Sequence, residues 1–321
     1  MKDPIQQLYD QLEEGGIDKI RTHYKPSTRF RASESGICMR AIWHRLRGDR
    51  PKPRTPVNEM YGLLGDVDHD VTRQLMNGSG TQVGHVDYSD GSGEGKETLQ
   101  IQKPYTVKRL ADDRDIEIIV SGRADGSLMS PRGRALLEIK GTGFYPYKWL
   151  ATAFTDGFTD KDKTFFKPGH DACIARIKEK HKTWYAQMQT SMAIFGYDLC
   201  YLVVKDRSSG TLGVHNPDTG ERTGLYIEFD AEFFQNTLQR FAHVASRLGA
   251  DISKGPKPEF ASKSTECSYC DFRWMCHEAS ERRSKGIEPT YLYPGPQLAE
   301  YHDGTKEETE SSSPKREDAK R

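Results

Sequence analysis

The stretch "LLEIKGTG" (Leu136–Gly143) reads as a buried strand that ends in a glycine turn. Successive side chains of a strand point to opposite faces, so Glu138 and Lys140 share one face. Leu137 and Ile139 share the other. An unpaired buried charge costs on the order of several kcal/mol. A compensating group is therefore expected next to Glu138 and Lys140.

Asp125 is the first candidate for that group. It stands thirteen residues before Glu138, in "SGRADGSL" (121–128), at the end of the preceding predicted strand. If the two strands pair as a hairpin, Asp125 lies beside Glu138 at one sheet edge, with Lys140 next to them. Two adjacent carboxylates repel, and a hard divalent cation such as Mg2+ or Mn2+, which takes oxygen ligands, is the usual compensation. Such an ion lowers the pKa of a bound water, and Lys140 can orient or stabilise the resulting hydroxide. The pattern predicts a catalytic metal site.

Composition limits the class of protein. The chain has 321 residues, 47 Lys and Arg, 47 Asp and Glu, and 35% hydrophobic residues, which suffices for one large domain or two small ones. Zero net charge gives no global argument for nucleic-acid binding, although local patches are compatible with it. No apolar run reaches the roughly 18 residues of a membrane span, and the polar N-terminus does not resemble a signal peptide. We expect a soluble cytoplasmic protein that does not contact a membrane.

Three of the six cysteines crowd into "ECSYCDFRWMC", as Cys267, Cys270 and Cys276 in a C-x2-C-x5-C spacing. In an intracellular chain such a cluster binds metal more often than it forms disulfides. A fourth ligand would complete a zinc site or an iron–sulfur cluster. The candidates are Cys38, Cys173, Cys200 and His277. Cys38 opens a predicted helix whose amide end suits an anionic cluster, whereas Cys200 lies in an apolar strand typical of a core. A structural zinc ribbon remains the alternative.

Hydrophobic periodicity predicts a mixed sheet with helices packed on it. Helices are expected over about 4–19, 35–48, 59–76, 183–197 and 231–249. Strands are expected over 99–107, 116–128, 134–140, 198–206 and 224–230. Residues 77–97 read as a loop with a short strand, and 141–182 as a mixed segment that becomes helical towards its end. From about residue 304 the polar, aperiodic tail predicts disorder.

The order of these motifs resembles that of the PD-(D/E)xK nucleases. Asp-x12-Glu-x-Lys is preceded by a helix with G-x3-H (Gly65, His69) and followed by a helix with Gln187. More narrowly, it resembles the RecB-like exonucleases with an iron–sulfur cluster, which include the CRISPR-associated Cas-four nucleases and related phage exonucleases. In that group one cysteine lies near the N-terminus and three follow at the C-terminus as C-x2-C-x5-C. Cys38 with the later three matches this pattern, and the resemblance spans about residues 31–277.

The resemblance implies a restriction-endonuclease-like α/β core, with a mixed central sheet flanked by helices and with chain ends joined by an iron–sulfur cluster. The implied cluster is 4Fe-4S, on Cys38, Cys267, Cys270 and Cys276. The implied catalytic residues are Asp125, Glu138, Lys140 and Gln187. The implied Mg2+ or Mn2+ ligands are His69, Asp125, Glu138 and the backbone carbonyl of Ile139. The implied divisions are a helical segment (1–30), the nuclease domain (31–280) and a C-terminal extension (281–321).

The implied activity is metal-dependent hydrolysis of phosphodiester bonds at single-stranded DNA ends, in recombination, repair or phage DNA processing. The host would be a prokaryotic or phage-infected cell. The chain has no G-x4-G-K-[ST] motif, so a helicase or recombination partner would be a separate protein. Two alternatives stay open. One is a weakly active or inactive nuclease-fold accessory protein of recombination or CRISPR adaptation. The other is a zinc-ribbon nucleic-acid binder in which E-x-K occurs by chance.

The chain departs from the family in a few places. The position four after Gln187 is Ser191 rather than tyrosine, with Tyr185 and Tyr197 on either side. Gln189 is an alternative to Gln187, and only one of them can face the site. Lys205 is a further candidate for the site. The long aromatic and basic segment after Lys140 is either a DNA channel or a capping subdomain. Its relevant residues are Phe144, Tyr145, Tyr147, Lys148, Trp149, Lys163, Phe165, Phe166 and Lys167.

Overall fold

The structure is a computed structural model of the chain. It describes residues 29–49, 51, 56–78, 83–84, 87–88, 96–97, 100–215, 222–250, 255–259, 264–273 and 275–276. The helix expected over 4–19, His277 and the extension 281–321 lie outside these residues. Arg29 and Phe30 belong to strand β1 (Arg29–Arg31). The predicted helical segment 1–30 is therefore wrong at its C-terminal end.

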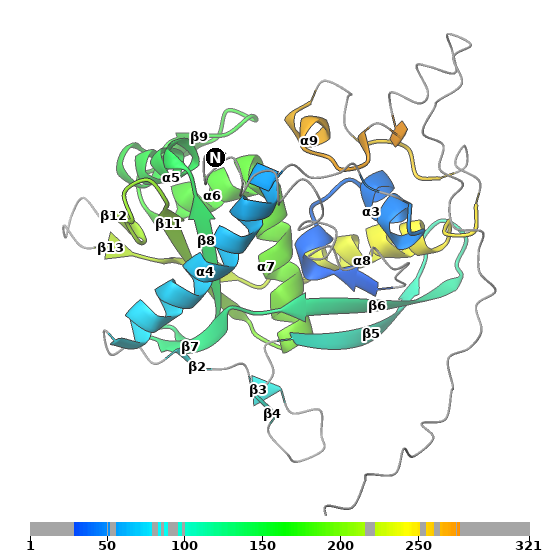
Figure 1. Cartoon of the computed structure of the whole chain (residues 1–321), viewed down its shortest axis with the longest axis horizontal. Helices are drawn as coiled ribbons and strands as arrows, with labels where there is room; N and C mark the ends of the chain where they lie inside the picture. The colour runs from blue at the N-terminus through cyan, green and yellow to red at the C-terminus, as the bar shows by residue number, and fades with distance from the viewer. Residues whose placement is uncertain are drawn as a thin grey trace, which may run out of the picture.

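A five-stranded mixed sheet forms the centre of the fold, in the order β14-β11-β8-β7-β2 (Figure 1). Its strands are β14 (Leu225–Glu228), β11 (Leu199–Asp206), β8 (Gly133–Thr142), β7 (Gly126–Ser130) and β2 (Val83–Gly84). β8 and β11 run parallel, and the other neighbours run antiparallel. The predicted mixed sheet with flanking helices is confirmed. The sheet places β8, which carries Glu138 and Lys140, in the middle rather than at an edge.

A second sheet of three strands has the order β1-β6-β5, with β6 (Asp115–Arg123) and β5 (Gln100–Lys108). The single strand predicted over 116–128 is therefore wrong. β6 ends at Arg123, β7 begins at Gly126, and the two strands belong to different sheets. The chain passes from one sheet to the other at Ala124 and Asp125. Residues 121–127 (Ser-Gly-Arg-Ala-Asp-Gly-Ser) are polar and contain two glycines, and this signal of a break was missed in the prediction of a single strand.

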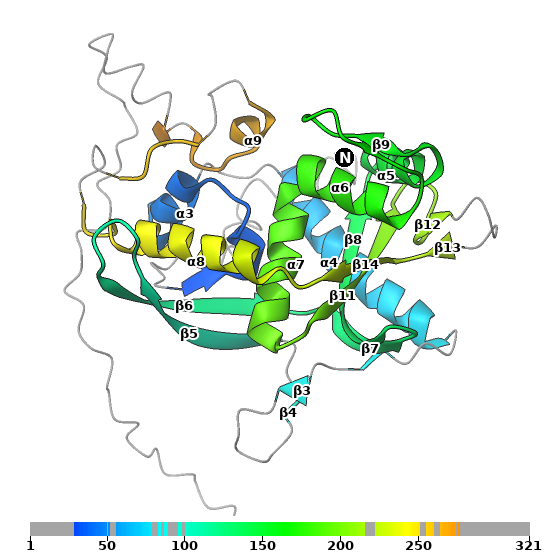
Figure 2. The same cartoon turned by 180° about the vertical axis from the view of Figure 1, so that it is seen from behind.

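Helices cover both faces of the central sheet (Figures 1 and 2). They are α4 (Pro56–Gly78), α5 (Phe144–Asp156), α6 (His170–Lys180) and α7 (Lys182–Phe195). The helix α8 (Ala231–Ala245) packs on β5 and β6 instead, and α3 (Met39–Leu46) packs on α8. On one face Leu137 and Ile139 pack with Met76 of α4. On the other face Leu136 joins the main core together with Met188 of α7. Among the described residues, no helix is both long and apolar enough to cross a bilayer.

Local signals in the sequence set the ends of the helices near the site. α7 stops at Gly196, which takes the left-handed conformation (φ 73°) that glycine adopts without strain. α8 begins after Asp230, whose carboxylate accepts a hydrogen bond from the backbone amide of Phe233 at 2.9 Å. The shorter elements are η2 (Ala32–Glu34), β3 (Asp87–Tyr88), β4 (Lys96–Glu97), β9 (Phe158–Thr159), β10 (Phe165–Phe166), β12 (Val214–His215), β13 (Arg222–Thr223) and α9 (Thr265–Ser268).

The segment 141–182 is more helical than its sequence indicates. The sequence predicts a helix only towards its end, where α6 lies, but α5 begins at Phe144, directly after β8. The buried side chains of α5 are Leu150, Ala153 and Phe154, while several of its aromatic residues are exposed. Large apolar residues therefore occur on both faces of α5, and this hides the helical period.

Candidate active site

Asp125 lies opposite Glu138, as the predicted hairpin requires. Gly126 of β7 pairs with Leu137 of β8 in antiparallel register, so the next position on each strand brings Asp125 and Glu138 together. The predicted location at a sheet edge is wrong, because β11 pairs with the other side of β8. This third strand comes much later in the chain, and the hairpin sequence alone gave no sign of it.

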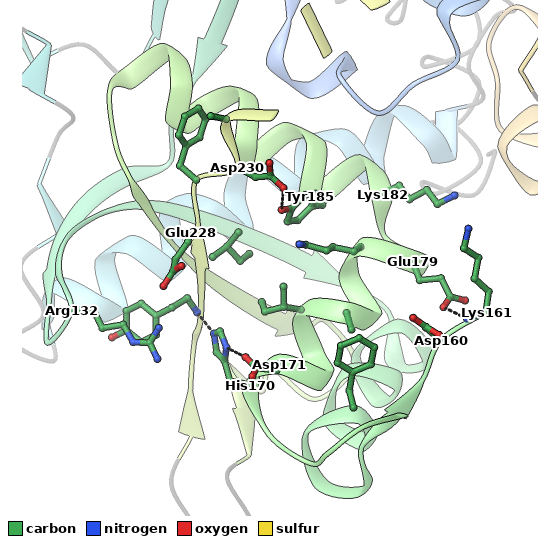
Figure 3. Close-up of a pocket in the computed structure, with 18 residues that line it drawn as sticks. Arg132, Asp160, Lys161, His170, Asp171, Glu179, Lys182, Tyr185, Glu228 and Asp230 are labelled. Atoms are coloured by element: carbon green, nitrogen blue, oxygen red, sulfur yellow. Dashed lines mark hydrogen bonds and ion pairs between the residues drawn. The ribbon is translucent and has the colours of Figure 1, made fainter. Parts of the chain in front are cut away.

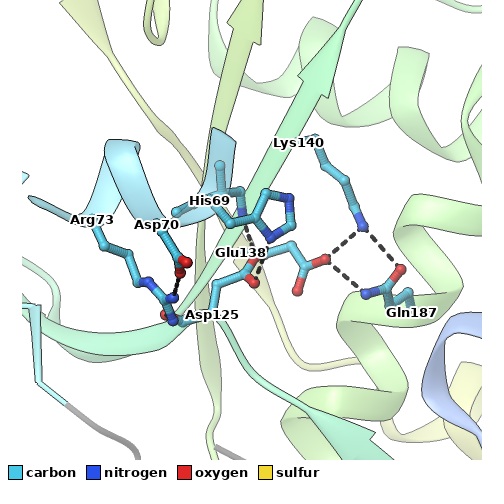
Figure 4. Close-up of polar contacts among 8 residues, drawn as sticks. His69, Asp70, Arg73, Asp125, Glu138, Lys140 and Gln187 are labelled. Atoms are coloured by element: carbon cyan, nitrogen blue, oxygen red, sulfur yellow. Dashed lines mark hydrogen bonds and ion pairs between the residues drawn. The ribbon is translucent and has the colours of Figure 1, made fainter. Parts of the chain in front are cut away.

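Glu138 is the most buried group of the site, with 2% of its side chain exposed. Its Oε1 lies 2.6 Å from Lys140 Nζ and accepts a hydrogen bond from Gln187 Nε2 at 2.8 Å (Figure 4). Lys140 Nζ donates in turn to Gln187 Oε1 at 2.9 Å. Burial raises the pKa of Glu138; the Lys140 charge opposes this shift, and the Asp125 charge adds to it. The three side chains form one closed hydrogen-bonded set, which holds Lys140 in place.

Asp125 is held by two other elements. Its Oδ1 lies 2.9 Å from His69 Nδ1 of α4, and its Oδ2 accepts from the backbone amide of Ile139 at 2.7 Å (Figure 4). Arg73, one helical turn after His69, donates to the Asp125 backbone carbonyl at 3.1 Å. Arg73 also pairs with Asp70 of the same helix. Sequence reasoning missed Arg73, although its spacing of four residues from His69 places both on one face of α4.

Gln187, and not Gln189, reaches Glu138. Gln189 is fully buried and faces the turn after β14. There it donates to the Glu228 carbonyl at 2.9 Å and accepts from the Asp230 amide at 2.7 Å. The sequence left the choice between the two glutamines open, and the rotation of α7 against the sheet decides it.

Neither neighbouring tyrosine joins the set around Glu138 in the described contacts. Tyr185 directs its hydroxyl towards Asp230 Oδ2 at 3.4 Å. The Tyr197 hydroxyl is buried without a hydrogen-bond partner in the described part of the chain. Ser191 is fully buried. Among the described residues, no tyrosine forms a hydrogen bond with Glu138, and the family's tyrosine therefore has no counterpart there.

Lys205 lies on the other face of the sheet from Lys140. Its Nζ lies 2.8 Å from Asp68 Oδ1, and Arg207 Nε lies 2.8 Å from Asp68 Oδ2. Burial acts to raise the pKa of Asp68, but hydrogen bonds and charges from Lys205 and Arg207 outweigh it and lower the pKa. A side chain at Gly141 would approach Arg207 Nε to 2.7 Å. The ion pairs of Asp68 with Lys205 and Arg207 join α4 to the central sheet next to His69. Of these three residues, the sequence had indicated only Lys205.

The donor set around Glu138 fits a hard divalent cation by its chemistry. Two carboxylates face each other, one of them buried with a raised pKa, and an imidazole lies beside them. A cation there would offset the carboxylate repulsion, and oxygen donors with one nitrogen suit Mg2+ or Mn2+. Among the described residues, no three His, Cys, Asp or Glu side chains form a preassembled metal-binding group.

Four cysteines from the two ends of the described chain come near one another. Burial raises the pKa of Cys276 to about 11; Arg40 opposes the shift, and the charges of Cys270 and Cys38 add to it. Burial also raises the pKa of Cys270, an amide hydrogen bond opposes this, and the charges of Cys38 and Cys267 add to it. In the described part of the chain, these four cysteines form no disulfide. Thiolates are the ligands that iron–sulfur and structural zinc centres take, but among the described residues no three of these side chains form a preassembled site.

The other two cysteines belong to the core. Cys173 is buried in α6, its Sγ donates to the Leu150 carbonyl at 3.3 Å, and burial raises its pKa to about 12. Cys200 is buried in β11, as expected for an apolar strand. Of the described candidates for a fourth ligand, Cys38 is the one whose charge raises the pKa of Cys270 and Cys276.

Hydrogen bonds tie α3, which begins after Cys38, to the segment that leads to the C-terminal cysteines. The Met39 amide donates to Glu259 Oε2 at 2.7 Å, and Trp43 Nε1 donates to the Arg247 carbonyl at 2.7 Å. Arg40 also donates to the Pro256 carbonyl at 2.9 Å. These hydrogen bonds join the start of α3 to residues 247–259.

A separate cavity of about 880 Å³ lies between α6, α7 and β14 (Figure 3). Its lining includes the basic residues Arg132 and Lys178 and the acidic residues Glu228 and Asp230. Tyr185 also lines it. The residues that line this cavity do not include those gathered around Glu138.

Comparison with known proteins gives only distant likenesses. Neither a protein-family model nor a curated protein matches the sequence. Among solved structures, SSO0001 is 13% identical over 86% of this chain and 98% of that one, with a TM-score of 0.41. The alkaline exonuclease LHK-Exo from Laribacter hongkongensis is 14% identical over 71% of this chain and 91% of that one, with a TM-score of 0.36. A phage-related exonuclease from Haemophilus somnus 129PT is 14% identical over 68% and 92%, with a TM-score of 0.27. At these values the likenesses carry no functional argument, so the assignment rests on the site itself.

Proposed function

We propose that this chain is a metal-dependent DNA exonuclease of the PD-(D/E)xK type, in its RecB-like, iron–sulfur form. The observation that carries the proposal is the buried Glu138 carboxylate, bonded to both Lys140 and Gln187 and opposed by Asp125. A surface E-x-K would not be buried or bonded in this way. An inactive accessory protein or a zinc-ribbon binder would have no need to bury Glu138 opposite a second carboxylate at this cost.

His69, Asp125, Glu138 and the Ile139 carbonyl are the groups that would hold Mg2+ or Mn2+ in this proposal. When bound, the ion lowers the pKa of a water and neutralises charge that develops on the phosphate. The hydrogen bond from the Ile139 amide fixes Asp125, and Arg73 fixes the backbone beside it.

Lys140 has the chemical role among the side chains. The Lys140 side chain is 15% exposed, and its ammonium group is fixed 2.6 Å from Glu138 Oε1. There it orients the attacking water and stabilises the negative charge on the phosphate as water adds to phosphorus and the bond to the leaving oxygen breaks. Gln187 bonds both partners and keeps the ammonium in that position.

The iron–sulfur cluster of the proposal is a 4Fe-4S centre on Cys38, Cys267, Cys270 and Cys276. Its role is structural, because hydrolysis of a phosphodiester needs no electrons. The packing of α3 on the segment that ends at Glu259 supports such a role, since the cluster would close the same junction.

The proposed substrate is DNA with single-stranded ends, and the proposed setting is recombination, repair or phage DNA processing in the cytoplasm of a prokaryotic or phage-infected cell. Unwinding would come from a separate helicase or recombination protein. The test is a cleavage assay on end-labelled single- and double-stranded DNA, with Mg2+, Mn2+ or EDTA. Release of short labelled products only with metal is expected. No cleavage of either DNA by protein with a full iron content would refute the proposal.

Lys140 and His69 are expected to respond differently to metal. Lys140→Ala should lower turnover about a hundredfold at saturating metal, because it removes charge stabilisation from the chemical step. His69→Ala should weaken metal affinity instead, so excess Mn2+, which accepts nitrogen ligands, should partly restore cleavage. The measurement is the cleavage rate over a range of Mn2+ concentrations. Equal rescue of both variants would show that the two roles are assigned wrongly.

Gln187 and Gln189 provide a matched pair. Gln187→Ala should lower the cleavage rate about tenfold or more with a smaller loss of stability than Gln189→Ala, because Glu138 Oε1 keeps Lys140 Nζ as a partner. Gln189→Ala should lower the stability by about 1–3 kcal/mol, because the buried Asp230 amide loses its acceptor. Its cleavage rate below the melting transition should stay near that of the wild type. The reverse pattern would place Gln189 at the site.

A further inference from the structure

Exposed aromatic side chains gather on and beside α5. Where the structure describes exposure, five aromatic residues are among the large exposed apolar side chains, and four of them lie between positions 144 and 165. They are Phe144 (51% exposed), Tyr145 (69%), Trp149 (44%) and Phe165 (59%). Single exposed rings are common, but a local group of them marks an interaction surface.

Two of these rings share one face of α5, because Tyr145 and Trp149 are four residues apart. The Phe144 ring lies beside them, with its centre 5.5 Å from that of Tyr145. Phe165 lies at the other end, because a side chain on Gly157, which caps α5, would come within 2.9 Å of its ring. α5 follows directly from β8, which carries Lys140 (Figure 1). The aromatic group therefore begins four residues after Lys140 in the chain.

Positive charges accompany the rings. Lys148 Nζ lies 5.8 Å from the centre of the Phe144 ring, and the Arg176 guanidinium lies 5.6 Å from that of Trp149. Residues 144–182 contain eight Lys and Arg against five Asp and Glu, in a chain with no net charge. Protein-binding surfaces are depleted in lysine at their centres, whereas rings interleaved with cations suit unpaired bases and phosphates.

We propose that this face, the α5 platform of Phe144, Tyr145, Lys148, Trp149, Phe165 and Arg176, binds single-stranded DNA by base stacking. The inference rests on the proposed nuclease function and adds where the strand lies. The 13 residues of α5 give a platform about 20 Å long. At about 3.4 Å per stacked base, it holds at most about six nucleotides. Stacking reads no sequence, so binding is tolerant of base composition.

Equilibrium binding of a fluorescent single-stranded oligonucleotide to the full-length protein tests the platform. The measurement is made in EDTA, so that hydrolysis cannot interfere. Trp149→Ala and Tyr145→Ala should each raise the Kd at least about fivefold, whereas Trp149→Phe, which keeps a ring, should bind almost like the wild type. Affinity for a blunt duplex should change much less. Lys148→Ala should reduce the slope of log K against log salt by about 0.7.

Leu110→Ala is the matched control, because Leu110 is a highly exposed apolar residue on the turn between β5 and β6. It should leave binding unchanged, and all these variants should melt like the wild type. Wild-type binding that is unaltered by Trp149→Ala and Tyr145→Ala would overturn the platform, as would a wild type that binds no single strand. Tight, ring-dependent binding without any cleavage in Mn2+ would instead uphold the platform and refute the nuclease function. The two proposals can thus fail separately.

Discussion

Replacing Asp125 by asparagine is expected to lower metal-dependent DNA cleavage by about a hundredfold to a thousandfold while the protein stays folded. The physical reason is charge. Asparagine can still accept the hydrogen bond from the Ile139 amide, so the junction between β6 and β7 keeps its geometry. It removes one of the two facing carboxylates, so a divalent cation loses much of its attraction to the site. The measurement is the cleavage rate at saturating Mn2+, with a melting curve beside it.

Asp113→Asn is the control for this experiment. Asp113 is an exposed aspartate that pairs with Lys108 on the turn between β5 and β6. Its replacement should leave both cleavage and melting temperature unchanged. Full activity of Asp125→Asn would remove Asp125 from the site. Alanine is a poorer choice at position 125, because it would leave the buried Ile139 amide without its acceptor at a cost of about 1–3 kcal/mol.

Replacing Cys38 by alanine is expected to have the largest effect on stability. Cys38 and Cys267 are 229 residues apart, so a cluster that joins them closes most of the chain into a loop. By analogy with a disulfide, such a closure restricts the unfolded chain by about 5 kcal/mol. Cys38→Ala should therefore lose most of the iron and sulfide and melt at a much lower temperature. Activity should fall with the fold, since the cysteines do not line the Glu138 site.

Cys173→Ala serves as the comparison, because Cys173 is buried but lies away from the other thiols. It should keep its full iron content and show only the packing cost of a lost side chain. Iron and sulfide content per chain decide the matter. Full iron content and an unchanged melting temperature in Cys38→Ala would break the link between the two ends. A local centre on Cys267, Cys270 and Cys276 would then be the better account.

The sequence was most informative where one strand carried the signal. Alternation along a strand puts Glu138 and Lys140 on one face, and the distance to Asp125 fits a hairpin, so this part of the site could be predicted. The polar, glycine-containing stretch around Ala124 and Asp125 indicates a break between the two strands, but it does not indicate which sheet each strand joins. Their assignment to different sheets depends on contacts with β1 and β2, which are remote in sequence.

Choices that depend on packing were beyond the sequence. Gln187 and Gln189 lie on different faces of α7, and only the docking of that helix turns one of them towards Glu138. The same holds for Lys205, which its strand directs to Asp68 on the opposite face. Pairs of distant groups such as these are fixed by the whole fold rather than by local propensity.

Binding of Mn2+ to the DNA-free protein, followed by electron paramagnetic resonance, tests the central claim most directly: Asp125 and Glu138 share a divalent cation. The account predicts that the wild type and Asp113→Asn bind Mn2+ alike. It predicts that Asp125→Asn and Glu138→Gln, folded by their melting curves, bind it at least about tenfold more weakly, because each removes a charged oxygen ligand. Equal Mn2+ affinity in all four proteins would contradict the account.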